Sequence, residues 1–146
     1  MKALKLIAAA ALALAATACM VLSDPEPKAT VTTREATGIS SESFTLSGTV
    51  EYRSSNAYTG EGGIFFSNKP GVNENQRILS TKSVNLRDGM NDLTCSANNW
   101  YTLLGPKTYY VQPGETCYYR AYARIFGNKV DKYILGEEKS FVVPSK

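Results

Sequence analysis

The sequence predicts an all-β domain, folded as a two-sheet antiparallel sandwich behind an N-terminal secretory signal. Three observations support this fold class. Short runs rich in β-branched and aromatic residues alternate with period two, and Gly, Pro, Asn and Asp separate them. Outside the signal, no window longer than about ten residues shows a helical period. Many short strands at regular turn spacing are typical of sandwiches and barrels.

The first 18 residues read as a signal peptide. "MKALK" is basic, the run from Leu6 to Ala16 is uncharged, and small residues follow it. The apolar run is shorter than the roughly 20 residues that a membrane-spanning helix needs. We therefore expect residues 1–18 to be removed from the mature chain.

Cys19 lies at the expected cleavage boundary. "ATAC" resembles the lipobox of bacterial lipoproteins, in which the cysteine becomes the first mature residue and carries lipid. The resemblance implies palmitate-type acylation of Cys19 and anchoring in the outer membrane, on either its surface or its periplasmic side. Ala16 stands where the lipobox usually has leucine. An ordinary signal-peptidase site, with Ala16 and Ala18 before the cut, therefore remains an alternative that would release a soluble protein.

Residues 19–28 are expected to form a tether. "MVLSDPEPK" sets two prolines among acidic residues, which favours a stiff, extended chain spanning at most about 30 Å. Residues 29–146 then have the size of one ordinary domain of about 100–150 residues with a single core.

The expected strands follow in order. "KATVTTREA" is a weak strand, and residues 43–52 form a clear one that places Phe44, Leu46, Gly48 and Val50 on one face. "NKPG", "RDGMND" (87–92), "QPGE" and "GNK" are read as turns. The further expected strands are residues 62–68, 77–84, 99–104, 108–111, 116–126, 132–135 and 139–143.

Composition argues against catalysis. The chain has no histidine, which removes the usual general base and the commonest metal ligand. There is no Gly-rich phosphate loop and no Cys-x-x-Cys pair, and no spacing selects a carboxylate pair. We expect no enzyme activity, no cofactor and no metal. The 16 basic and 13 acidic residues are nearly balanced, so no nucleic-acid partner is expected.

Four blocks carry a family resemblance. "ATGISSESFTLSGTV", "GGIFFSNKPGV", "VQPGETCYYRAYAR" and "LGEEKSF" resemble fibronectin type III-like domains in lipoproteins of Gram-negative anaerobes. They occur in the same order, from strand B through C and F to G, and cover most of residues 36–143. The resemblance implies a fibronectin type III-like sandwich. Residues 73–110 do not follow the pattern well and are longer than usual.

One departure from that family involves the cysteines. In such sandwiches a tyrosine four residues after the proline that opens strand F bonds back to the chain, and here Cys117 stands there. Tyr118 points the other way and cannot replace it. An inward Cys117 is expected to pair with Cys95, since the envelope is oxidising; closing a loop of about 22 residues stabilises by roughly 3 kcal/mol. The alternative is two buried thiols packed as small hydrophobes.

The strand around Cys117 also presents a candidate binding face. Alternation sends Cys117, Tyr119, Ala121 and Ala123 into the core. It leaves an outer row exposed to water: Tyr118, Arg120, Tyr122 and Arg124. This row is either an ordinary outer face on which arginine stems cover tyrosine rings, or a platform for a protein or acidic glycan. Trp100 is likewise either a core plug or an exposed stacking residue beside Asn98 and Asn99.

Three functions remain open. The leading one is a lipid-anchored, non-catalytic envelope module that binds a protein or glycan partner or serves as an accessory subunit of an envelope assembly. The second is a structural spacer or pilus-like component that uses its sheet edges. The third is a small envelope enzyme inhibitor acting through residues 73–110.

Overall fold

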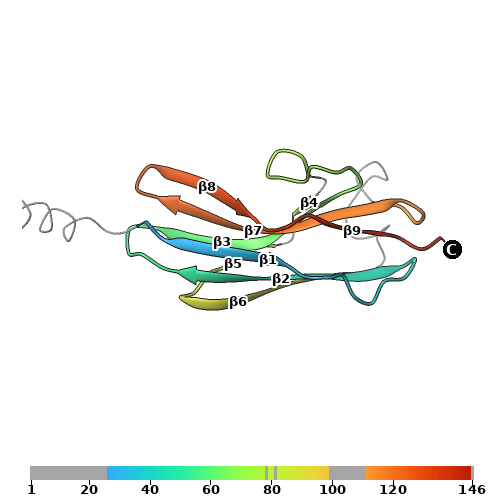
Figure 1. Ribbon diagram of the computed structural model, residues 1–146, viewed down its shortest axis with the longest axis horizontal. Helices are drawn as coiled ribbons and strands as arrows, with labels where there is room; N and C mark the ends of the chain where they lie inside the picture. The colour runs from blue at the N-terminus through green and yellow to red at the C-terminus, as the bar shows by residue number, and fades with distance from the viewer. Residues whose placement is uncertain (1–25, 78, 81, 99–110, 146) are drawn as a thin grey trace, which may run out of the picture.

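The computed structural model describes residues 26–77, 79–80, 82–98 and 111–145. Two antiparallel sheets lie one on the other along an elongated domain (Figure 1). All regular elements in these ranges are strands, so the predicted all-β sandwich is confirmed. Within them no helix is long and apolar enough to cross a membrane. The signal, Cys19 and most of the tether lie outside the described residues.

The two sheets differ in size. The smaller one has the order β1-β2-β6, formed by β1 (Lys28–Thr33), β2 (Ser43–Arg53) and β6 (Gly89–Asn98). The larger one has the order β4-β3-β7-β8, formed by β4 (Leu79–Ser80), β3 (Thr59–Ser67), β7 (Thr116–Gly127) and β8 (Val130–Leu135). Two short strands complete it: β5 (Val84–Asn85) pairs with β3, and β9 (Lys139–Val142) pairs with β7.

The clearest predicted strands are confirmed almost residue for residue. In β2, Phe44, Leu46 and Val50 are fully or nearly fully buried. The turn between β7 and β8 has Asn128 and Lys129 at positive φ, which suits a two-residue hairpin of twisted strands. Strand pairing stops between β8 and β9 around Gly136.

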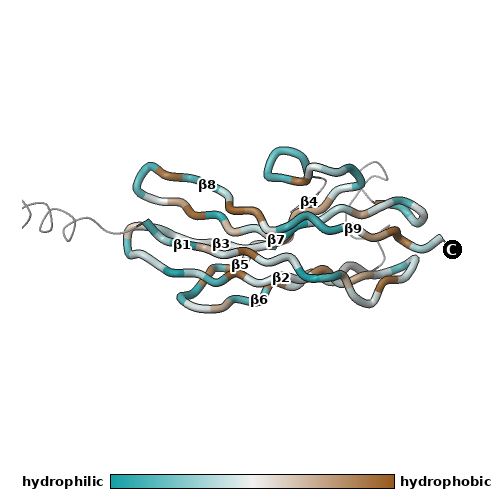
Figure 2. Tube along the Cα trace, viewed as in Figure 1, coloured by the Kyte–Doolittle hydropathy of each residue, from teal (hydrophilic) through white to brown (hydrophobic). Residues whose placement is uncertain are grey.

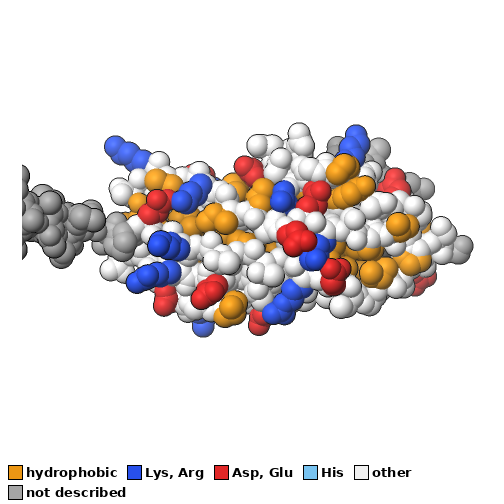
Figure 3. All heavy atoms as spheres, in the orientation of Figure 1, with side chains coloured by type: hydrophobic (Ala, Val, Ile, Leu, Met, Phe, Trp, Pro, Cys, Tyr) orange, Lys and Arg blue, Asp and Glu red, His pale blue; other side chains and the backbone are white. Residues whose placement is uncertain are grey.

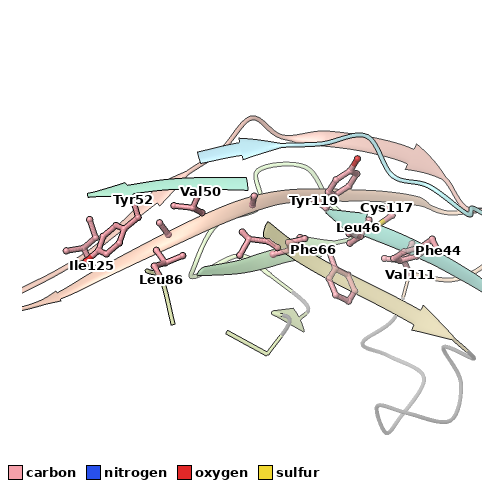
Figure 4. Packing of buried hydrophobic residues seen from close by; sticks show 14 of the residues in the cluster. Phe44, Leu46, Val50, Tyr52, Phe66, Leu86, Val111, Cys117, Tyr119 and Ile125 are labelled. Carbon is pink, nitrogen blue, oxygen red and sulfur yellow. The ribbon is translucent and has the colours of Figure 1, made fainter. Parts of the chain in front are cut away.

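The main core fills the space between the sheets (Figure 4), and the tube in Figure 2 alternates between polar and apolar colours along the strands. Full burial of one large apolar side chain stabilises the fold by roughly 1.5–3 kcal/mol. The largest side chains of the main core come from β2, β3 and β7: Phe44, Leu46, Val50, Tyr52, Ile64, Phe66, Tyr119 and Ile125. The sheets lie close together at Gly48, where a Cβ would lie 2.7 Å from the Cβ of Ala121.

The middle of the chain differs from the prediction in two places. "RDGMND" is not a turn throughout: β6 begins at Gly89 and continues to Asn98 as the partner of β2. The Asn91 amide makes this possible, because it accepts from the Arg87 N–H and donates to the carbonyls of Arg87 and Gly89, closing the turn early. The expected strand 77–84 is replaced by the separate β4 and β5. The strand expected at 99–104, and all but the last residue of the strand expected at 108–111, lie outside the described residues.

Candidate functional site

The outer face of the larger sheet, the side away from the smaller sheet, carries the row predicted from sequence. Tyr118, Arg120, Tyr122 and Arg124 alternate along β7 with buried core residues, so their predicted direction is confirmed. The strand register sets their neighbours. Arg124 lies between Glu61 and Tyr133, Tyr122 between Gly63 and Leu135, Arg120 opposite Phe65, and Tyr118 between Ser67 and Ser140.

Tyr122 is not exposed to water, contrary to the sequence prediction. Only 5% of its surface is accessible, and its ring stacks on Phe65 with centroids 3.8 Å apart and planes 6° from parallel. Its cross-strand partner Gly63 is the reason, since a Cβ there would lie 2.7 Å from the Tyr122 hydroxyl oxygen. With no side chain opposite, the ring lies flat on β3.

The outer face therefore has a small core of its own. Phe65, Val72 and Tyr122 are buried together, and three half-buried side chains pack against them: Tyr118, Tyr133 and Leu135. Val72 comes from the loop that follows β3 and is fully buried. That loop covers part of the face that the alternation predicted to be open.

Arg120 is half-buried and holds this loop, so it too differs from the exposed residue expected. Its Nε donates to the Gly136 carbonyl at 2.9 Å and its Nη1 to the Val72 carbonyl at 3.1 Å. From the other side, Glu138 Oε1 accepts from the backbone N–H groups of Gly71 at 2.9 Å and Val72 at 2.7 Å. Arg120 and Glu138 thus act as structural clamps on the loop.

Arg124 is bound on several sides. It donates two hydrogen bonds to the Asp131 carboxylate, at 2.9 and 2.8 Å, and its Nη1 lies 3.9 Å from a Glu61 oxygen. Its guanidinium lies over the rings of Phe126 and Tyr133, as the structural interpretation of the row predicted. The hydrogen bond from Arg124 lowers the pKa of Asp131. This cation is therefore largely neutralised.

A shallow groove of about 440 Å³ opens on the same face. It is lined by Glu61, Arg77, Ser80, Lys82, Ser83, Tyr122, Arg124 and Tyr133. The Arg77 guanidinium lies 4.5 Å above the centre of the Phe65 ring. Sequence reasoning missed Arg77 and Lys82, because both fall in the stretch that it assigned to one continuous strand.

The predicted disulfide is absent: Cys95 and Cys117 are free thiols. Cys117 is fully buried beside Leu46 and Tyr119 (Figure 4), and Cys95 packs against the same core. Burial, with a smaller contribution from Cys95, raises the pKa of Cys117 to about 12. The structure thus matches the alternative of two thiols packed as small hydrophobes.

The remaining predicted residues give no further site. Trp100, with Cys19, lies outside the described residues. Within the described part of the chain, no group of three or more His, Cys, Asp or Glu side chains is placed to hold a metal ion. Basic and acidic side chains are interspersed on the face seen in Figure 3. Of the predicted site residues, Tyr122 and Arg124 line the groove on the larger sheet, which makes it the candidate site.

Comparison with known proteins supports the class of fold that the two sheets define. No protein family matches the sequence, and no curated protein matches it. Among solved structures, the chain is similar to the sensor domain of the anti-sigma factor RsgI4 of Pseudobacteroides cellulosolvens. The TM-score is 0.54 at 12% identity, covering 81% of this chain and 96% of that one. A longer form of that domain gives a TM-score of 0.48 at 12% identity, covering 82% and 92%.

The similarity extends to the fold alone. It supports the all-β sandwich in the predicted resemblance, whereas the fibronectin type III-like lipoprotein family itself is not identified.

Proposed function

We propose that this protein is a non-catalytic binding module, tethered to the cell envelope by lipid on Cys19, that recognises its partner through the groove on the larger sheet. One observation carries the binding part of the proposal. The groove gathers basic, aromatic and hydroxyl side chains from β7, β8 and the stretch from Arg77 to Ser83, with one carboxylate from β3. Arginine and tyrosine are the side chains that contribute most at binding surfaces.

The chemistry of the groove favours binding over catalysis. The chain has no histidine, and Glu61 is the single carboxylate among the lining residues. Hydrolysis of a glycosidic bond on two carboxylates would need a second acid in reach. The arginine and lysine side chains of the groove pair with carboxylates or attract negatively charged groups. None of the lining residues is an activated nucleophile.

The fold itself does not decide the role. RsgI4 uses a similar sandwich as a sensor domain, but one fold hosts many functions. The proposal therefore rests on the groove for binding and on the residues around Cys19 for the anchor.

The anchor is tested by metabolic labelling with a palmitate analogue. We expect label on the full chain, none on the Cys19→Ala variant, and full labelling of the matched Cys95→Ala variant. Label that persists without Cys19, or a mature chain that leaves the membrane fraction without detergent, would overturn the anchor.

The binding role is tested by filling the groove. Ser80→Trp places a large ring in it without removing a charge, and Thr30→Trp makes the same change on an exposed position of the opposite sheet. Arrays of glycans and envelope proteins are probed with the full chain and both variants. We expect the ligands found to bind Ser80→Trp at least about tenfold more weakly and Thr30→Trp unchanged. Equal binding to both variants, or no ligand at all, contradicts the proposal.

A further inference from the structure

The geometry of the groove points to its ligand class: we infer that it binds an acidic oligosaccharide through the sugar's carboxylate or sulfate group. This inference rests on the proposed function and specifies what the module recognises. It is carried by two cations that have no acidic partner among the described residues, by the hydroxyl groups around them, and by the small amount of aromatic surface left open.

Two cations in the groove have no acidic partner among the described residues. Arg124 is occupied by Asp131 and Glu61, whereas Arg77 and Lys82 form no ion pair there. Arg77 is held 4.5 Å over Phe65, which orients its guanidinium and leaves its N–H donors available. A planar guanidinium donates two parallel hydrogen bonds to a carboxylate or sulfate, so its fork matches such a group.

The position of these cations follows from the broken edge of β3. Ser80 pairs opposite Phe65, and Val84 pairs opposite Gly62. The chain between Ser80 and Val84 is one residue longer than the stretch of β3 between Gly62 and Phe65. An extra residue interrupts regular pairing, as in a β-bulge. Lys82 and Ser83 consequently line the groove instead of continuing a straight strand.

The other polar groups of the groove suit a sugar. Ser80 and Ser83 are exposed and offer hydroxyls that both donate and accept, and Glu61 supplies an acceptor for sugar hydroxyl groups. A ligand with an acid group and several hydroxyls satisfies the cations and these groups together. An acidic peptide such as polyglutamate offers carboxylates to the cations but lacks the hydroxyl groups that Ser80, Ser83 and Glu61 can bond.

The aromatic rings argue against an acidic peptide as well. Phe65 is fully buried and Tyr122 is 5% exposed, so their faces are used within the protein. Tyr133 is half-buried and is the main ring surface left at the groove. Peptide recognition normally adds apolar pockets for side chains, whereas one partly open ring beside polar groups is enough to support a sugar ring.

The test uses the full chain in detergent micelles and titration calorimetry. The probes are tetragalacturonate, a chondroitin sulfate tetrasaccharide, a neutral galactose tetrasaccharide and a hexaglutamate peptide. The variants are Arg77→Gln, Lys82→Gln and the double variant. Arg53→Gln removes the same charge from an exposed position on the smaller sheet. Thermal unfolding confirms that each variant is folded.

We expect at least one acidic sugar to bind. Tighter binding of the chondroitin sulfate tetrasaccharide, which carries carboxylates and sulfates, than of tetragalacturonate, which carries carboxylates alone, would show that sulfate contributes. The neutral sugar and the peptide should bind at least about tenfold more weakly. The double variant should lower the association constant for the acidic sugar at least about tenfold, and Arg53→Gln should leave it unchanged. Rising salt should weaken binding to the unmodified chain more than to the double variant.

Several results would overturn the inference. Hexaglutamate binding as tightly as the acidic sugars would mark a general anion site. A neutral sugar binding equally, no acidic sugar binding, or an unaffected double variant would remove the role of Arg77 and Lys82. If another ligand is lost on Ser80→Trp but kept by the double variant, this inference fails while the proposed function stands.

Discussion

The hydroxyl of Tyr119 donates a 2.8 Å hydrogen bond to the backbone carbonyl of Arg34. The bond joins the central strand of the larger sheet to the segment that follows β1, and in Figure 4 the oxygen points toward that segment. One residue earlier, the Thr33 hydroxyl accepts from the Ala121 N–H at 3.0 Å. Two side-chain bonds thus tie residues 33–34 to β7.

Removing the Tyr119 hydroxyl is predicted to destabilise the fold. Tyr119→Phe leaves the Arg34 carbonyl without this donor, which should lower the free energy of unfolding by about 1–2 kcal/mol. Tyr52→Phe is the matched control, because the buried Tyr52 hydroxyl has no hydrogen-bond partner in the described structure. Removing the Tyr52 hydroxyl should leave the free energy of unfolding unchanged or raise it slightly. Urea unfolding measures both, and equal losses would contradict the assignment.

The Glu138 clamp is predicted to control the loop over the outer face. Glu138→Ala removes the acceptor of the Gly71 and Val72 N–H groups, so hydrogen exchange at these two amides should accelerate at least about tenfold. The neighbouring Glu137→Ala removes only an exposed 3.7 Å contact with Lys139 and should leave both amides protected. Unchanged exchange in Glu138→Ala would show that the loop is held by other contacts.

The Cys117 thiol is predicted to make the free energy of unfolding fall with rising pH in the alkaline range. Burial raises its pKa from 9.0 to about 12 in the folded chain. The folded state therefore holds the thiol proton more tightly, and this stabilisation is complete below pH 9 and lost as the pH rises toward 12. The loss amounts to roughly 4 kcal/mol for the fully buried thiol.

Urea unfolding between pH 8 and pH 11 should show a steeper decline for the unmodified chain than for Cys117→Ala. Tyrosines with raised pKa values, Tyr52 among them, contribute equally to both curves. Parallel curves would contradict the prediction. A Cys95–Cys117 disulfide in unreduced mature protein, detected by mass spectrometry, would contradict the free thiols on which it depends.

The ion pair between Arg124 and Asp131 is predicted to affect the acid titration of the Asp131 carboxyl group. The hydrogen bond from Arg124 lowers the pKa of Asp131 below 3.8. Its contribution to stability is therefore present above that value and lost as the pH falls through the folded-state pKa. In Arg124→Gln the pKa should return toward 3.8, as followed by carboxyl-carbon NMR. Lys132→Gln, whose ammonium bonds to Glu26, should leave it unchanged.

Much of the scaffold could be predicted because strand periodicity is a local property. The alternation from Phe44 to Val50 reports which face of β2 is buried, and it needs no knowledge of the partner strand. The same rule gave the correct direction of every side chain in the outer row of β7. It failed for β6, which begins at Gly89 inside the predicted turn 87–92 because the side chain of Asn91 closes that turn early.

The exposure of the outer row could not be predicted in the same way. Tyr122 is buried because Gly63 lies opposite it on another strand and because Val72 comes over it from a distant loop. The free thiols are similar: the sequence places Cys95 and Cys117 in the domain, but only their positions in the core show whether they are joined. The groove depends on the one-residue difference between β3 and its edge partners, which appears only when the register is known.

The sequence by itself determined that this chain is an all-β domain with alternating faces, and it supports a lipoprotein-like start as a prediction. Those properties depend on residues next to one another in the chain. Only the tertiary structure decided which outward side chains remain available for a ligand. Availability depends on cross-strand partners and covering loops, and these are brought together by folding from positions far apart in the sequence.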